Sequence, residues 1–401
     1  MLKKFTKDQI LVLIGACLSQ CALLGILVNC VSVLLAAVQN DMGMAMTQIS
    51  SYHTLKSLAT AASAAFLSAL FFRMNKGVFM GLCIGGVVLG HLLLVINPTG
   101  ILWWVSALVI GVSFSTCGIC VPVILGQWFP KNAGFATGIA LAFSGIGGVL
   151  FNPIASKLIT AYGWRSAIVI MSIVTAAIAI PGVVLAFGKK PPVTEEEAPA
   201  AAKQMQQSTR TGADESLAKK LFPLCQLALA SGTIVVMFYN YISSYATGLG
   251  YSLEVGATMA SMVMAGNVLG KLIFGAACDK FGVWKSMQVN FLVLVGSMLC
   301  FLLLDNMLPA LYLASLLLGS VYGINMIAVS RGCVQAYGQE GSKKYIGTHT
   351  AINSGLGTAC SFLVGPLYDA TGSFTALLII NVVMLVLSFT SVTAIRKLTK
   401  A

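Results

Sequence analysis

Charged residues are scarce in this chain of 401 residues: only 9% are Asp, Glu, Lys or Arg, whereas a soluble globular protein has about 25%. Hydrophobic residues make up 58% of the sequence. Apolar runs of about 20 residues, long enough to cross roughly 30 Å of hydrocarbon, recur from one end of the chain to the other. The composition therefore predicts a multi-pass membrane protein and excludes a soluble one.

Several kinds of functional site are also missing from the sequence. The eleven cysteines are an odd number and lie in apolar segments, where free Cys behaves as a small hydrophobic residue, so we expect neither a disulfide framework nor a metal cluster. No nucleophile–base set or nucleotide loop is present; GNVLGK at 266–271 is one residue too short for a phosphate loop, and Leu272 replaces its Ser or Thr. We therefore expect no enzyme activity, no cofactor and no bound metal.

What is present is a series of twelve predicted spans, at roughly 10–38, 48–72, 78–97, 101–128, 134–157, 165–187, 221–247, 253–277, 284–304, 309–336, 345–368 and 373–395. A polar, Ala- and Pro-rich stretch has the composition of a flexible linker and separates two sets of six. We predict an N-terminal bundle at 1–188, a linker at 189–220 and a C-terminal bundle at 221–401. Small residues at 138–170 recur 209 positions later, which indicates a duplicated transporter with a substrate site between its halves near the bilayer midplane.

The basic residues predict the orientation of the chain. Nineteen of the 24 Lys and Arg fall at the N-terminus, in the even-to-odd loops, in the linker or at the C-terminus, and only Lys157 and Arg165 lie on the opposite side. By the positive-inside rule, both termini and the linker are cytoplasmic. The net charge of +12 is thus a feature of topology and not a sign of nucleic-acid binding. Short loops and a compact chain favour the inner membrane of a bacterium.

Acidic residues are absent from the interior of every predicted span. All twelve lie in tails, loops or span ends: Asp8, Asp41, Glu195, Glu196, Glu197, Asp214, Glu215, Glu254, Asp279, Asp305, Glu340 and Asp369. Three cations, Lys56, Lys271 and Arg331, lie within spans, so we expect them to have no carboxylate partner there. A charge at a helix centre costs about 2.5–3.5 kcal/mol on insertion scales, so such residues usually face a cavity or a partner. An anion that arrives from outside is a natural partner, namely the substrate.

Two segments resemble known transporters. GKLIFGAACDKFGVWKS at 270–286 resembles the loop signature of the major facilitator superfamily, in which Asp279 and Lys280 would bridge helix ends and serve a gate on the cytoplasmic side. GQWFPKNAGFATGIALAFSGIGG at 126–148 and YGWR at 162–165 are similar to the monocarboxylate and oxalate–formate transporter families. The resemblance implies an all-α fold with twelve transmembrane helices in two pseudo-symmetric six-helix bundles.

The carboxylate transporters suggest where the substrate binds. They carry an Arg in the eighth span, one turn after an Asp or Asn, and here Asn267 and Lys271 hold that spacing. Lys keeps the charge but lacks the bidentate fork with which Arg grips a carboxylate. The lysine of oxalate transporters in the eleventh span has no counterpart; His349 and Asn353 lie in that segment instead. The alternative for Lys271 is that its ammonium group reaches to the cytoplasmic interface.

Other polar residues in the spans are further candidates. Lys56 is a candidate for gating or substrate attraction, or else it reaches outward; Arg331 contacts the substrate or stabilises the inner gate. Those expected to line the cavity are Asn29, Tyr239, Asn240, Tyr241, Tyr322 and Asn325. The alternative for these six is hydrogen bonding between helices, because buried polar groups in hydrocarbon need partners. A proton, if one moves, would use His53, His91 or His349, a lysine, or the substrate itself.

We expect a secondary active transporter, a functional monomer in the lipid bilayer, that moves a small organic anion. The sequence favours a monocarboxylate, moved with a proton or in exchange for a counter-anion. One alternative is an exporter of neutral or drug-like compounds, because the positive interior conflicts only with a cationic substrate. The second alternative is a non-transporting membrane sensor or enzyme, for which the sequence offers no site.

Overall fold

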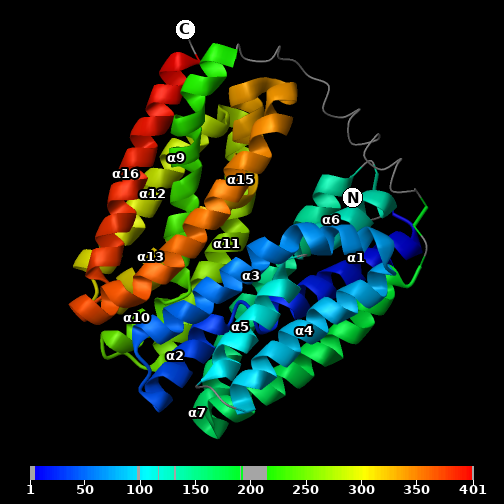
Figure 1. Ribbon diagram of the computed structural model, residues 1–401, viewed down its shortest axis with the longest axis vertical. Helices are drawn as coiled ribbons and strands as arrows, with labels where there is room; N and C mark the ends of the chain where they lie inside the picture. Colours follow the sequence, from blue (N-terminus) through cyan, green and yellow to red (C-terminus); the bar gives the residue numbers. More distant parts are fainter. Residues whose placement is uncertain are drawn as a thin grey trace. The chain divides into compact units, whose positions relative to one another are not determined.

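The computed structural model describes residues 5–96, 100–115, 117–130, 132–189, 191–192 and 215–399 (Figure 1). Every regular element in these ranges is helical, which confirms the predicted all-α fold. Most of the predicted linker at 189–220 lies outside the described residues. By their contacts, residues divide into unit 1, which comprises 1–38 and 55–208, and unit 2, which comprises 39–54 and 209–401.

The helices from the N-terminal part of the chain begin with α1 and end with α7. They are α1 (Lys7–Gln20), the π-helical η2 (Cys21–Ile26), α2 (Val31–Met42), α3 (Met46–Arg73), α4 (Lys76–Ile96), α5 (Ile101–Phe114), α6 (Cys117–Trp128) and α7 (Ala133–Phe187). The end of α2 and the start of α3, residues 39–54, belong to unit 2 by their contacts. The predicted boundary at 188 does not separate this segment.

The remaining helices belong to unit 2. They are α9 (Glu215–Tyr239), α10 (Ile242–Gly248), α11 (Leu253–Phe281), α12 (Val283–Leu303), α13 (Leu308–Leu318), α14 (Val321–Gly323), the π-helical η3 (Ile324–Ala328), α15 (Val329–Thr371) and α16 (Thr375–Leu398). In Figure 1, α16 lies beside α9 and α12, and these contacts hold the C-terminal helix in the bundle.

Seven helices of the described chain are long and apolar enough to cross a membrane. Helix α7 contains two predicted spans, and α15 contains the end of the tenth predicted span and all of the eleventh; each turns at a glycine with positive φ, 76° at Gly163 and 73° at Gly338. Glycine takes this backbone conformation without a steric penalty, so it allows the chain to reverse with no loop. The number of twelve spans stays a prediction.

The outer face of the helices is apolar. In unit 2, Leu272 and Ile273 of α11 are both 67% exposed, and Val289 and Leu292 of α12 are 63% and 60% exposed. Soluble monomers rarely expose contiguous apolar patches of this kind. Hydrocarbon is the solvent in which such a surface is stable, so this is a membrane-embedded, multi-pass protein.

Helix α11 packs unusually close to α13 and α14. A Cβ atom on Gly266 would lie 1.9 Å from the carbonyl oxygen of Leu316, and one on Gly270 would lie 2.6 Å from the Cα of Ser320. Small residues at i and i+4 let two membrane helices bring their backbones together. The spacing GNVLG at 266–270 therefore lets α11 approach its neighbours closely, and it fixes which residues of α14 meet α11.

We predict that Gly266→Ala destabilises the protein, because the new methyl group cannot fit against the Leu316 carbonyl without moving α13. Overpacking of this kind costs about 1–3 kcal/mol. Gly296→Ala is the matched control, because a Cβ at this helical position of α12 meets nothing within 4 Å. Thermal unfolding in detergent should show a lower midpoint for Gly266→Ala only; equal midpoints for both variants would contradict the close packing.

Candidate functional site

Lys271 and Tyr322, two candidates from separate helices, lie together in unit 2. The ammonium nitrogen of Lys271 on α11 lies 5.7 Å from the centre of the Tyr322 ring on α14. A cation within about 6 Å of an aromatic ring is attracted by its negative face, by about 0.5–2 kcal/mol depending on solvent exposure. The close approach at Gly270 brings the two helices near enough for this contact.

Asn267 lies one turn before Lys271 on α11 and is buried. Its side-chain nitrogen makes a weak hydrogen bond to the sulfur of Met264, at 3.8 Å, and its side-chain oxygen is buried with no hydrogen-bond partner. An unpaired buried polar atom costs about 1–3 kcal/mol. Asn267 therefore retains capacity to bond a ligand or to orient the neighbouring ammonium group.

The charge of Lys271 is not neutralised within the described part of the chain. Two ion pairs of this part of the structure join Lys189 to Asp8 and Arg331 to Asp279, and Lys271 takes part in neither. The Tyr322 ring stabilises the ammonium group only in part, since a ring carries no net charge. An anionic ligand would complete the site, with Lys271 as counter-charge and Asn267 as hydrogen-bonding partner.

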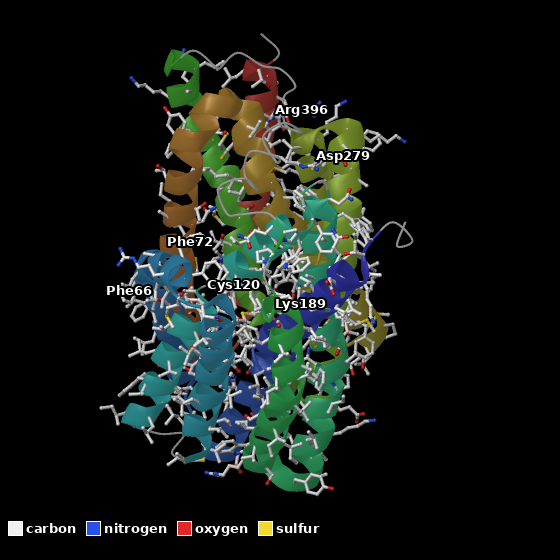
Figure 2. All side chains as sticks on the ribbon, turned by 90° about the vertical axis from the view of Figure 1, so that its right-hand side faces the viewer. Phe66, Phe72, Cys120, Lys189, Asp279 and Arg396 are labelled. Carbon is white, nitrogen blue, oxygen red and sulfur yellow. The ribbon has the colours of Figure 1, made fainter. Side chains whose placement is uncertain are left out.

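Arg331 corrects the expectation that all three cations in spans lack a carboxylate. Its guanidinium nitrogen lies 2.5 Å from the Oδ1 atom of Asp279, and both side chains are substantially exposed, at 46% and 69%. Asp279 is in the last turn of α11 and Arg331 is in the first turn of α15, so the ion pair joins these two helices. In Figure 2, Asp279 lies at the same end of unit 2 as Arg396. This pair supports the structural alternative for Arg331.

Lys280, the basic residue expected to serve the cytoplasmic gate, lies beside an aromatic ring. The ammonium group of Lys280 lies 5.3 Å from the centre of the Phe281 ring, next in sequence. The carboxylate of Asp279 is bridged to α15 through Arg331, and the part of Lys280 in bridging helix ends stays a prediction.

Lys56 belongs to unit 1. Its ammonium nitrogen lies 5.4 Å from the centre of the Phe114 ring on α5. Helices α3 and α5 are close here, because a Cβ on Gly111 would lie 2.3 Å from the Lys56 carbonyl oxygen. The side chain thus lies over an aromatic ring within its own bundle.

Two of the candidate amides bond other helices. The Asn29 side chain follows η2 and donates to the carbonyl oxygen of Ser144 at 2.8 Å; that of Asn325, in η3, donates to the carbonyl oxygen of Gly232 at 3.2 Å. π-Helical turns leave the regular hydrogen-bond pattern, and amide side chains can then tie the irregular segment to a neighbour. These contacts match the structural alternative.

The predicted seventh span is broken at its polar run. Helix α9 ends at Tyr239, which is buried, and α10 begins at Ile242. Asn240 lies in the break, and its side-chain nitrogen is 3.8 Å from the sulfur of Met237. His53, from the part of α3 that belongs to unit 2, is buried with its ring 5.2 Å from that of Tyr241. The break thus places an amide and two aromatic rings together.

His349 is fully buried in a hydrogen-bonded chain. Its Nδ1 atom lies 2.6 Å from the Gln226 side-chain oxygen, its Nε2 atom lies 2.9 Å from the Tyr337 hydroxyl, and Gln226 donates to Asn353 at 2.8 Å. The ring stacks on Phe222, with 4.5 Å between ring centres. An amide oxygen only accepts, so Nδ1 carries the proton and Nε2 accepts from Tyr337. Both nitrogens of the neutral ring are satisfied, which supports a structural role.

Sequence reasoning missed Gln226 and Tyr337 as partners of His349. Gln226 is the amide of an otherwise apolar stretch at the start of the seventh predicted span, which is the signal that could have found it. Among the described residues, no group of three or more His, Cys, Asp or Glu side chains could hold a metal ion.

Asp369 is a second residue whose role the sequence did not reveal. Its carboxylate accepts hydrogen bonds from the backbone nitrogens of Met46 and Thr47, both at 2.9 Å, and from the Thr47 hydroxyl at 2.5 Å. All three residues belong to unit 2. The N-terminus of α3 presents unpaired N–H groups and a partial positive charge, which favour an anion. Partial burial raises the pKa of Asp369, but the three hydrogen bonds outweigh it, and the pKa lies below its ordinary value of 3.8.

We predict that Asp369→Asn lowers stability by about 0.5–2 kcal/mol, the typical value of a helix cap, because an amide cannot accept all three hydrogen bonds. A lowered pKa means that the carboxylate stabilises the fold above pH 3.8, and that this stabilisation is lost as the pH falls toward the pKa of the folded state. Thermal unfolding at several pH values should therefore show a gap between wild type and Asp369→Asn that narrows in acid.

The control for Asp369 is Glu254→Gln, which removes an exposed carboxylate from the first turn of α11. This change should have a smaller effect at every pH. A gap between wild type and Asp369→Asn that is absent at neutral pH, or that widens in acid, would contradict the assigned contact.

Comparison with known proteins finds a family match over most of the chain and relatives that are transporters. The sequence model of the Major Facilitator Superfamily matches residues 17–358. Monocarboxylate transporter 12 of Rattus norvegicus is 23% identical over 395 residues, which cover 87% of this chain and 77% of the rat protein. Its human counterpart is 25% identical over 304 residues, 66% of this chain, and the match spans only 57% of the human protein.

Solved structures share the fold. A crystal structure of the nucleoside transporter NupG matches with a TM-score of 0.72 at 13% identity and covers 98% of this chain and 100% of its own. A bacterial homologue of the human lysosomal transporter Spinster, in an inward-facing and occupied conformation, matches with a TM-score of 0.69 at 13% identity and covers 97% and 96%. At this identity the likeness concerns the fold alone. Together with the family match, it confirms the predicted fold class and the resemblance on which it was based.

Proposed function

Because this chain belongs to the major facilitator superfamily of membrane transporters, we propose that it is a secondary active transporter of a small organic anion, in particular a monocarboxylate. Transport proceeds by alternating access, through anion exchange or proton symport. We further propose that it acts as a monomer in a cell inner membrane with both termini cytoplasmic, as the distribution of Lys and Arg suggests.

The observation that carries this proposal is the charge of Lys271. The ammonium group lies on a membrane helix, faces the Tyr322 ring and forms no ion pair with any carboxylate that the structure describes. A charge in this position is costly unless it has a partner. A transported carboxylate supplies that partner during each cycle, and Asn267 offers a hydrogen bond beside it.

A single lysine favours a substrate with one carboxylate. An ammonium group is a point charge with three donors, whereas a guanidinium group grips two oxygens in a fixed plane. The sequence places two cations of unit 2 inside spans, Lys271 and Arg331. Arg331 is paired with Asp279, so Lys271 is the one of the two with no described ion pair. The resemblance to monocarboxylate transporter 12, a relative named for monocarboxylates, supports the same class of substrate.

His349, a candidate proton carrier, bears on whether transport is coupled to protons. His349 is satisfied as a neutral ring by Gln226 and Tyr337, so a proton on its Nε2 atom would require the Tyr337 hydroxyl to turn from donor to acceptor. Exchange of one anion for another needs no proton carrier on the protein. Symport would move the proton with the carboxylate or on a group other than His349.

We predict that Lys271→Gln lowers uptake of the transported anion into proteoliposomes by about 10- to 100-fold, since a hydrogen bond to a charged group is worth about 1.5–3 kcal/mol. Labelled lactate, formate, acetate, oxalate and pyruvate form the panel. Lys271→Arg should keep part of the activity because it keeps the charge. The control is Lys157→Gln, an exposed lysine of α7, which should transport like wild type.

The same assay separates the coupling modes. Faster uptake with unlabelled anion inside indicates exchange, and faster uptake with an imposed pH gradient indicates symport. Equal uptake by wild type and Lys271→Gln would overturn the role of Lys271. Failure of wild type to move any of the five anions, with uptake of a neutral compound instead, would overturn the substrate class.

A further inference from the structure

Unit 2 contains a groove of about 560 Å³ that the candidate anion site does not include. It lies between α11, α12 and the end of α13, and its volume is within the range of about 300–1,000 Å³ typical of ligand pockets. Neither Asn267, Lys271 nor Tyr322 lines it. The groove is therefore a separate feature of the same bundle.

The walls of the groove are apolar and open toward the membrane. Leu269 and Ile273 of α11 and Val289 of α12 line it, and each is half exposed or more. The uncharged polar side chains in the lining bond one another or the backbone: Asn290 and Ser320 are within hydrogen-bond distance of each other, and the Ser286 hydroxyl donates to the Gly282 carbonyl oxygen. Away from Lys285 the walls offer a polar anion no partner, whereas a hydrocarbon chain would lose nothing by leaving the bilayer.

The groove is longer than the hydrocarbon of one membrane leaflet is thick. Its lining on α11 runs from Gly266 to Phe281, which at 1.5 Å per residue is about 22 Å along the helix. Half of the roughly 30 Å hydrocarbon core is about 15 Å. An acyl chain that enters at the Phe281 end would thus reach the bilayer midplane within the groove.

A cation lies at the Phe281 end. Lys285, exposed on the first turn of α12, is part of the lining, and Lys280 precedes Phe281 on α11. The acid near this end is Asp279, which is two residues from both Ala277 and Phe281 and so lies on another face of α11 from these lining residues. Its charge is paired with Arg331. The mouth of the groove therefore presents net positive charge on the side of the membrane predicted to be cytoplasmic.

We propose that this groove is a binding site for an anionic phospholipid of the cytoplasmic leaflet. One acyl chain fills the space between α11, α12 and α13, and the headgroup phosphate pairs with Lys285. The bound lipid would brace α11, the helix that carries Lys271, against α12. The proposal rests on the groove and its charge and is independent of the substrate.

The test uses the full chain, purified in detergent, incubated with equal parts of phosphatidylglycerol and phosphatidylethanolamine and then washed. Native mass spectrometry counts the lipids that remain. Wild type should retain one phosphatidylglycerol in preference to phosphatidylethanolamine. Lys285→Gln should lower that preference about fivefold, the equivalent of about 1 kcal/mol for one basic residue, and Lys285→Arg should keep it.

A second pair of variants tests the groove itself. Val289→Trp places an indole in the lining and should abolish retention of the lipid, whereas Leu292→Trp, on the same helix and equally exposed but outside the lining, should not. Lys397→Gln, in the last turn of α16, is the control for charge alone. Retention of both lipids in equal amounts by wild type, loss of the preference in Lys397→Gln as in Lys285→Gln, or a lipid still bound to Val289→Trp would each overturn the proposal.

Discussion

A positive charge on a membrane helix, with no described carboxylate to neutralise it, is the constraint on which this account of the protein depends. The hydrocarbon around α11 gives the ammonium group of Lys271 no solvation, so the protein must supply a partner or accept one from outside. What it supplies is an aromatic ring: Tyr322 lies 5.7 Å away. A ring lowers the cost of the charge without cancelling it, so the site remains attractive to an anion that can also leave.

The packing of unit 2 follows from the same requirement. Helix α11 meets α13 and α14 at Gly266 and Gly270, where no side chain separates the backbones. This close contact sets the height of Tyr322 relative to Lys271. On its other side α11 has apolar residues that face the membrane. The helix therefore has one face for packing, one for lipid and one that carries the charge.

Polar side chains elsewhere in the bundles form within the protein the hydrogen bonds that hydrocarbon cannot offer. Asn29 and Asn325 bond backbone carbonyls next to π-helical turns, and His349 is held from both sides by Gln226 and Tyr337. Asn267 differs, because its side-chain oxygen has no partner. The Oδ1 atoms of Asn152 and Asn381 are also buried with no hydrogen-bond partner, so what distinguishes Asn267 is its position one turn before the ammonium-bearing Lys271.

The all-α membrane fold could be predicted from the sequence, because membrane helices are recognised by the length and apolar composition of their segments. The i, i+4 relation of Asn267 to Lys271 and the close packing at Gly266 and Gly270 are local, and a helix fixes them without reference to the rest of the chain. Contacts between distant segments could not be predicted in this way. Arg331 meets Asp279, 52 residues away, and Asp369 caps a helix that begins 323 residues earlier.

Those long-range pairs depend on where helix ends meet in space, which no periodicity encodes. The same is true of the break in the seventh span. The run MFYNYISSY at 237–245 lies inside the predicted seventh span, and nothing in its composition shows that α9 ends at Tyr239 and α10 begins at Ile242. The sequence could therefore predict which residue types form the candidate site, but which of those residues are in contact depends on the fold.

The most direct test of the central claim compares two ligands that differ only in charge. Binding of the transported carboxylate and of its uncharged amide would be measured by calorimetry on purified wild type and on Lys271→Met, which keeps the apolar stem without the ammonium group. If Lys271 is the counter-charge, wild type prefers the carboxylate by about 10- to 100-fold and Lys271→Met loses that preference. A Lys271→Met variant that still distinguishes the two ligands as wild type does would contradict the account.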